Sequence, residues 1–175
     1  MTVSVVVNGP PRAGKDTFVD MCMILLRDAG FTCSKHSSVD MVKKAAELLG
    51  WDGVKDERGR QFLSDIKDLS TVAYNGPFLY MLDVVATRQH DVMFFHIREP
   101  EEISEFVRYT NGVKVIVERP GCPTFSNHAD KRVRLMTYDF DVYNDKDLNK
   151  LSARAAAFVK VLCVRQLREV IPQNE

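Results

Sequence analysis

Short apolar runs alternate with amphipathic stretches along this chain. The first run, Val3–Val7, is rich in β-branched residues and predicts a strand buried on both faces. Similar runs predict further strands at Phe31–Lys35, Val92–Ile97, Val113–Val117 and Phe140–Tyr143. Stretches with apolar residues at helical spacing predict helices at Asp16–Asp28, Ser38–Leu49, Glu57–Tyr74, Phe78–Gln89, from Glu99 onward, and at Asp147–Val170.

The alternation of strands and helices predicts an α/β fold. Strands joined by helical crossovers lie parallel in one sheet, with helices on both faces in three α/β/α layers. The length of 175 residues suits a single domain, which we place at residues 1–175. Residues 120–134 lack apolar periodicity and contain two prolines, a glycine and several basic residues. We interpret this segment as a lid that closes over bound phosphates; an ordinary surface loop is the alternative.

A glycine-rich motif follows the first strand directly. Residues 9–17 read G-P-P-R-A-G-K-D-T, which has the G-x-x-x-x-G-K spacing of a phosphate-binding loop. Gly9 and Gly14 allow a tight turn whose N–H groups point at phosphate oxygens, and Lys15 adds a charge for the β- and γ-phosphates. Asp16 stands where Ser or Thr normally holds Mg²⁺. The motif predicts nucleoside triphosphate binding, and a glycine-proline turn before an ordinary helix is the alternative.

Charged residues follow the other predicted strands. Ligands of parallel sheets bind at the carboxyl ends of the strands, where Arg98 and Arg119 are expected. The planar fork of arginine suits a bound phosphate. His96 occupies a position where many phosphate-loop proteins have an acid that orders the water shell of Mg²⁺. We interpret His96 as a structural histidine. Either Asp16 supplies the missing carboxylate, or the site binds Mg²⁺ weakly.

Composition narrows the function classes. With 24 basic and 24 acidic residues the net charge is zero, which argues against a dedicated nucleic-acid binder and still allows a local basic cleft. The four cysteines form no C-x-x-C pair, so reduced thiols and a cytoplasmic location are expected. No apolar run reaches the length of a membrane span, and the first residues predict a strand rather than a signal peptide.

The motifs and their order resemble those of the phosphate-loop nucleoside monophosphate kinases, most closely the phage-type deoxynucleoside monophosphate kinases. The G-x-x-x-x-G-K-D-T variant, with its Asp16, is a hallmark of that branch. Asp40–Trp51 is similar to the family's substrate-side helix, and Phe94–Glu102 to its D-x-R-x-P-x-E segment. His128–Asp130 is similar to its H-x-S-E segment, and Asp139–Leu148 to its final strand with the residues after it.

This resemblance implies a P-loop NTPase fold with a five-stranded parallel sheet in the order 2-3-1-4-5. It also implies a substrate-binding helical insert at about 37–90 and a short lid at about 120–135. The implied reaction transfers the γ-phosphate of ATP to a (deoxy)nucleoside monophosphate, with Mg²⁺ bound near Asp16. The expected donor-binding residues are Gly9, Arg12, Ala13, Gly14, Lys15, Asp16 and Thr17. The expected acceptor-binding residues are Ser38, Asp40, Lys43, Arg58, Arg98, Glu102 and Arg119, and the expected catalytic residues are Lys15, Arg98 and Arg132.

Other functions fit the same motif. A nucleotide-binding regulatory module with little turnover would explain a histidine at position 96. A small-molecule kinase that acts on a hydroxyl would need a general base, for which Asp40 is the nearest candidate. Dephospho-coenzyme A and phosphomevalonate kinases share much of the implied plan. The expected partners are small-molecule nucleotides and a second copy in a homodimer, without nucleic acid or membrane.

Overall fold

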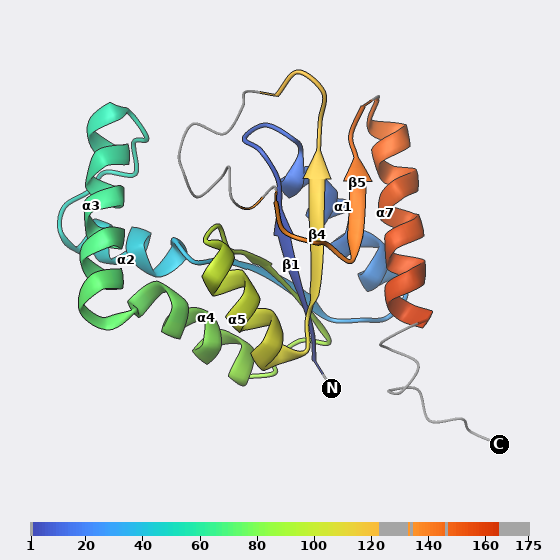
Figure 1. The fold of residues 1–175 in the computed structure, drawn as a ribbon, viewed down its shortest axis with the longest axis horizontal. Coiled ribbons are helices and arrows are strands. Elements are labelled where there is room, and N and C mark those ends of the chain that lie inside the picture. The colour runs from blue at the N-terminus through green and yellow to red at the C-terminus, as the bar shows by residue number, and fades with distance from the viewer. Residues whose placement is uncertain (1, 123–132, 134, 146, 165–175) are drawn as a thin grey trace. The chain divides into compact units, whose positions relative to one another are not determined.

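The computed structural model describes residues 2–122, 133, 135–145 and 147–164 of the chain. It divides into two compact units (Figure 1). We call Met1–Lys35 with Arg88–Glu175 the core unit, and His36–Thr87 the helical unit. The helical unit spans nearly the same residues as the predicted insert at about 37–90. The assignment of residues 1–175 to a single domain stays a prediction.

A five-stranded sheet forms the centre of the core unit. Its strands are β1 (Val3–Asn8), β2 (Cys33–Ser37), β3 (Val92–His96), β4 (Val113–Glu118) and β5 (Phe140–Tyr143). They lie in the order β2-β3-β1-β4-β5, and β1 pairs in parallel with β3 and β4, as β4 does with β5. All six residues of β1 are buried, as expected for a central strand with covered faces. The predicted strand order and three-layer α/β/α fold are confirmed.

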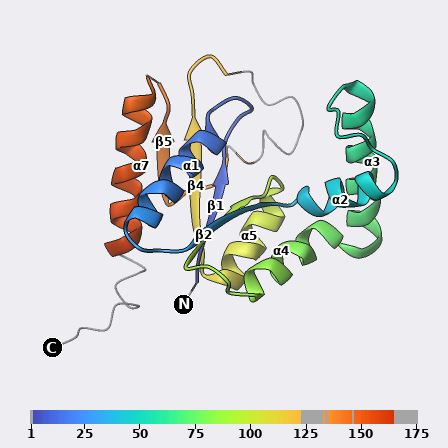
Figure 2. The same ribbon diagram turned by 180° about the vertical axis from the view of Figure 1, so that it is seen from behind.

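Helices cover both faces of this sheet because successive strand residues point to opposite sides. Val5, Val7 and Phe94 belong to the apolar cluster that contains the buried side chains of α1 (Lys15–Asp28) and α7 (Leu148–Leu162). Phe95 faces the other way, and its ring centroid lies 4.7 Å from that of Phe106 on α5 (Pro100–Thr110). In Figure 2, which is turned by 180°, α1 is seen in front of the strands.

Aromatic contacts fix α1 against α7. The ring centroids of Phe18 and Phe158 are 5.6 Å apart, and Phe140 of β5 meets Phe158 edge-on at 5.1 Å. Such pairs contribute roughly 0.5–1.5 kcal/mol beyond their buried area. They hold the first turn of α1, which carries Lys15 and Asp16, in a fixed position beside the end of β1.

The helical unit contains α2 (Asp40–Leu48), α3 (Glu57–Tyr74) and α4 (Gly76–Ala86). The Asp56 side chain caps α3 by accepting a hydrogen bond from the Gly59 N–H at 2.7 Å. Asn75 adopts a left-handed conformation, with φ of 50°, and serves both as the C-cap of α3 and as the N-cap of α4. The predicted break at residues 75–77 is therefore a sharp corner, and α4 begins two residues earlier than predicted, at Gly76.

Other boundaries also differ from the sequence predictions. Strand β2 begins at Cys33 rather than Phe31, since Thr32 donates from its N–H and hydroxyl to the Asp91 carboxylate at 2.8 and 2.7 Å. Helix α2 begins at Asp40 rather than Ser38, and its N-cap residue, Val39, makes no side-chain hydrogen bond. The predicted continuation of the last helix through residues 165–170 lies outside the described residues. Among the described helices, none combines the length and apolar character needed to span a membrane.

Candidate phosphate-binding site

The loop between β1 and α1 turns sharply at three residues with positive φ: Gly9 at 146°, Arg12 at 65° and Gly14 at 92°. At Gly9 the backbone passes so close to β4 that a Cβ atom would overlap the carbonyl oxygen of Val117. A Cβ at Gly14 would lie 2.6 Å from the Asn144 side-chain nitrogen. Close approach to backbone and φ both require glycine at position 9. At position 14 the positive φ favours glycine, and a side chain there would also displace the Asn144 amide.

Two buried asparagines anchor this loop at its two ends. Asn8 accepts a hydrogen bond from the Gly9 N–H at 2.7 Å and donates to the Ile97 carbonyl beyond β3 at 2.8 Å. Asn144, which follows β5, donates from its side chain to the Ala13 carbonyl at 2.8 Å. Only 4% of Asn8 and 7% of Asn144 is exposed, so their side-chain amides form hydrogen bonds with protein groups rather than with water. The ends of neighbouring strands therefore hold the loop in shape.

Lys15 lies half-buried at the start of α1, directly after the loop. Its ammonium group donates to the carbonyl oxygens of Gly9 at 2.7 Å and Pro10 at 2.9 Å. These hydrogen bonds keep the Lys15 ammonium group over the loop rather than extended into solvent. The lysine is thereby placed where the motif predicts a contact with the terminal phosphates.

Asp16 and His96 meet beside the same loop. The Nε2 atom of His96, at the end of β3, lies 3.4 Å from the Oδ1 atom of Asp16 in the first turn of α1. The histidine side chain is 18% exposed and the aspartate side chain 79%. Burial lowers the pKa of His96, the Asp16 carboxylate opposes that shift, and Lys15 adds to it. A net lowering from the ordinary value keeps the imidazole neutral at pH 7.

A cavity of about 480 Å³ opens next to the loop. It is bounded by the loop end and α1 on one side and by the β4 and β5 ends with the start of α7 on the other. Its lining residues are Gly14, Thr17, Arg119, Asn144, Asp147, Leu148, Asn149 and Leu151. Arg119, which was predicted to contact the acceptor, thus shares a cavity with two residues of the predicted donor loop.

No family model and no curated protein matches this sequence. Solved structures do match its fold. A shikimate kinase from Aquifex aeolicus covers 93% of the chain and 99% of its own at 14% identity, with a TM-score of 0.53. A putative kinase from Chloroflexus aurantiacus covers 93% and 97% at 12% identity, with a TM-score of 0.53. An APS kinase from Mycobacterium tuberculosis covers 92% and 97% at 12% identity, with a TM-score of 0.50. The fold is that of the P-loop kinases.

Two other predicted residues of the core unit follow strand β3, and a third lies outside the described residues. Arg98 is exposed two residues after β3, and Glu102 is half-buried in the first turn of α5. Arg132 and most of the predicted lid lie outside the described residues. Within the described residues, no group of three or more His, Cys, Asp or Glu side chains is arranged to hold a metal ion.

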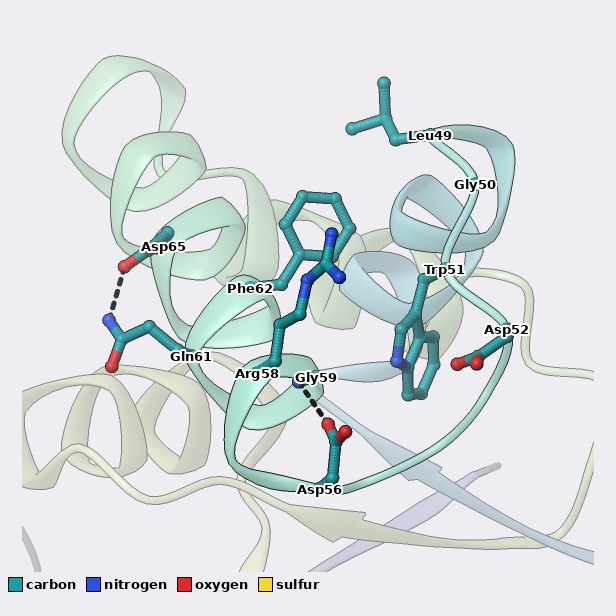
Figure 3. Close-up of a pocket in the computed structure, with 10 residues that line it drawn as sticks. All are labelled: Leu49, Gly50, Trp51, Asp52, Asp56, Arg58, Gly59, Gln61, Phe62 and Asp65. Atoms are coloured by element: carbon teal, nitrogen blue, oxygen red, sulfur yellow. Dashed lines mark hydrogen bonds between the residues drawn. The ribbon is translucent and has the colours of Figure 1, made fainter.

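The helical unit contains a second cavity, of about 640 Å³. Figure 3 shows Trp51 on the loop after α2 and Arg58 and Phe62 one turn apart on α3, together with three aspartates. The other lining residues are Leu49, Gly50, Asp52, Asp56, Gly59, Gln61 and Asp65. The Trp51 indole N–H donates to the Val54 carbonyl at 3.0 Å, which fixes one wall of the cavity.

The remaining predicted acceptor residues serve local structure at the start of α2. Asp40 Oδ2 accepts a hydrogen bond from the Ser37 N–H at 2.7 Å, and Oδ1 pairs with the Lys43 ammonium at 3.0 Å. Ser38 is buried with 3% exposure. Of the residues predicted for the acceptor, Arg58 is the one from the helical unit that lines its described cavity.

Asn8, Asn144, Trp51 and Phe62 are not among the site residues predicted from the sequence. A polar residue that ends a buried strand beside a P-loop motif is the signal that could have identified Asn8. An aromatic residue one helical turn after a basic residue could have identified Phe62, and a tryptophan shortly before that helix could have identified Trp51.

Asn144→Ala is expected to lower the free energy of unfolding by about 1–3 kcal/mol, because the buried Ala13 carbonyl would lose its hydrogen-bond donor. The same change is expected to weaken ATP-analogue binding, since the P-loop loses one of its anchors. Urea unfolding and a fluorescence titration measure the two effects. The control Asn149→Ala, at an exposed position on α7, is expected to leave stability within about 0.5 kcal/mol of the parent. Equal stability of the two variants would contradict the anchoring role.

Proposed function

We propose that this protein transfers the γ-phosphate of ATP to a (deoxy)nucleoside monophosphate. The observation that carries the proposal is the P-loop itself. Its backbone is turned by Gly9 and Gly14, Lys15 caps it with positive charge, and the cavity of about 480 Å³ adjoins it. An ordinary glycine-proline turn before a helix would not need this combination of features.

The donor is proposed to bind with its phosphates on the loop N–H groups and its nucleoside in the adjoining cavity. Lys15 would exchange its hydrogen bonds to the Gly9 and Pro10 carbonyls for bonds to phosphate oxygens. Arg119 lines the cavity and supplies a second cation close to the donor. These groups offset charge on the transferred phosphoryl group and hold it in line.

The residues also fit a divalent metal ion. Asp16 offers an exposed carboxylate one residue after Lys15, and carboxylate oxygen is a ligand that Mg²⁺ accepts. When bound with ATP, the ion would neutralise charge on the β- and γ-phosphates. Asp16 would then replace the hydroxyl ligand that the usual motif provides.

The cavity of the helical unit supports a nucleotide as the acceptor. Trp51 and Phe62 offer aromatic surfaces for a base, and the Arg58 guanidinium can bind a phosphate through two parallel hydrogen bonds. A monophosphate acceptor needs no general base, because its attacking oxygen is already anionic. Both carboxylate oxygens of Asp40 are engaged, which counts against Asp40 as the base of a hydroxyl-directed kinase.

ADP release tests the proposed function. Purified protein with ATP and Mg²⁺ is supplied in turn with each common deoxynucleoside and ribonucleoside monophosphate, and with shikimate and APS as acceptors that bear hydroxyls. Release with a monophosphate is the expected result. Release only with a hydroxyl acceptor would replace the proposed substrate class.

A second function, nucleotide binding with little turnover, is supported by His96 at the end of β3, where an acid would order the metal. Tight binding of a non-hydrolysable ATP analogue without ADP release from any acceptor would favour it. The homodimer and the cytoplasmic location stay predictions, and sedimentation velocity tests the first.

A further inference from the structure

We propose that His96 and Asp16 together form a nitrogen-and-oxygen ligand pair that selects a first-row transition ion, such as Mn²⁺ or Co²⁺, over Mg²⁺ at the P-loop. The inference rests on the proposed function, because the remaining ligands would be phosphate oxygens of the bound nucleotide and water. It assigns His96 a ligand role in place of the structural role expected from the sequence.

The first observation is the spacing of the two side chains. His96 Nε2 and Asp16 Oδ1 are 3.4 Å apart, which is long for a charge-assisted hydrogen bond. Two atoms that each bind one metal ion at about 2.1 Å, at octahedral to tetrahedral angles, lie roughly 3.0–3.4 Å apart. The pair is therefore spaced as two ligands of one ion rather than as an optimised ion pair.

The second observation is the state of the imidazole ring. His96 Nε2 is buried and makes no hydrogen bond within the described structure, so its lone pair is available. The Val7 backbone on the neighbouring strand β1 favours a proton on the ring and so opposes part of the lowering of the His96 pKa. An imidazole with one nitrogen open toward a carboxylate is the arrangement that a metal-binding histidine needs.

The chemistry of this pair favours particular ions. Imidazole nitrogen is a better ligand for first-row transition ions than for Mg²⁺; the preference is strongest for ions such as Ni²⁺ and Zn²⁺ and weakest for Mn²⁺, which also favours oxygen. Mg²⁺ prefers oxygen ligands and gives up water reluctantly. Two protein ligands alone hold such ions weakly, and the described residues supply no third ligand of the His, Cys, Asp or Glu type. The selectivity is therefore expected in the complex with nucleotide rather than in the protein alone.

Pulsed electron paramagnetic resonance of Mn²⁺ tests the pair directly. The full chain is loaded with Mn²⁺ and AMPPNP, a non-hydrolysable ATP analogue, and examined for ¹⁴N modulation from a coordinated imidazole. We expect the modulation in the parent protein and its loss in His96→Gln. His90→Gln, which changes another partly buried histidine at the opposite end of β3, is the control and is expected to retain it. A parent complex without ¹⁴N modulation would overturn the proposal, whatever the folding of the variant.

Binding constants provide a second readout. The affinity for AMPPNP is measured with Mn²⁺ and with Mg²⁺ for the parent, His96→Gln and Asp16→Asn. His96→Gln is expected to lose the preference for Mn²⁺ by about 10-fold or more while Mg²⁺-dependent binding changes little. Asp16→Asn is expected to weaken binding with both ions. Nucleotide binding with equal affinity for the two ions would overturn this inference alone, whereas no nucleotide binding at all would overturn the proposed function with it.

Discussion

Lys15→Ala is expected to reduce ADP release by about 10³-fold at saturating ATP while the protein stays folded. The ammonium group is held over the P-loop by the Gly9 and Pro10 carbonyls, at 2.7 and 2.9 Å. It therefore lies beside the bound phosphates, and once it has exchanged these carbonyls for phosphate oxygens it can offset the charge that develops on the transferred phosphoryl group. Initial-rate measurements of ADP release, with the best acceptor of the panel, give the loss directly.

The control for this change is Lys160→Ala, which removes an exposed lysine from the last turn of α7. Its rate and thermal midpoint are expected to match those of the parent. Lys15→Arg adds a further comparison, because it keeps the charge but cannot occupy the same space between two carbonyls, and its rate is also expected to fall. Undiminished turnover of Lys15→Ala would refute the assignment of this loop to phosphoryl transfer.

Gly9→Ala is expected to lower the free energy of unfolding by at least about 3 kcal/mol. The new methyl group would overlap the Val117 carbonyl oxygen on β4, and neither backbone can withdraw because both belong to or adjoin the central strands. The φ of 146° adds strain that any side chain would feel. Chemical denaturation of the parent and variant measures the change.

Gly30→Ala separates the two causes of that loss. Gly30 has a positive φ of 88°, but a Cβ there would meet no atom within 4 Å. The control is therefore expected to cost only about 1–2 kcal/mol, the strain of a left-handed conformation without overlap. If Gly9→Ala were no more destabilising than Gly30→Ala, the close approach of the P-loop to β4 would not be a constraint on the fold.

The sequence predicted best what depends on local pattern. Helix α3 and strand β5 have their predicted bounds, Glu57–Tyr74 and Phe140–Tyr143. For α3 the reason is clear, since Asp56 caps its first turn and Asn75 ends it in a left-handed conformation. The start of β2 could not be predicted in this way, because it depends on a contact between Thr32 and Asp91, which are 59 residues apart.

In the candidate site, too, the features that depend on local sequence were predictable and those that depend on distant contacts were not. The glycines and Lys15 of the P-loop were recognisable because the motif is contiguous and its spacing reflects backbone geometry. The partner of Asp16 was not, since the distance between Asp16 and His96 depends on how β3 aligns with β1 in the sheet. Pairing register is a tertiary property, and the apolar pattern of each strand is compatible with several registers.

The bond from Asn144 to the Ala13 carbonyl joins residues 131 positions apart. A ribosome-bound chain that has emerged only through β4 contains every residue of the P-loop motif but not the amide that supports it. Nucleotide binding is therefore expected to appear only after β5 has joined the sheet. Although the motif is synthesised long before β5, the nascent chain acquires a competent loop only once β5 is in place.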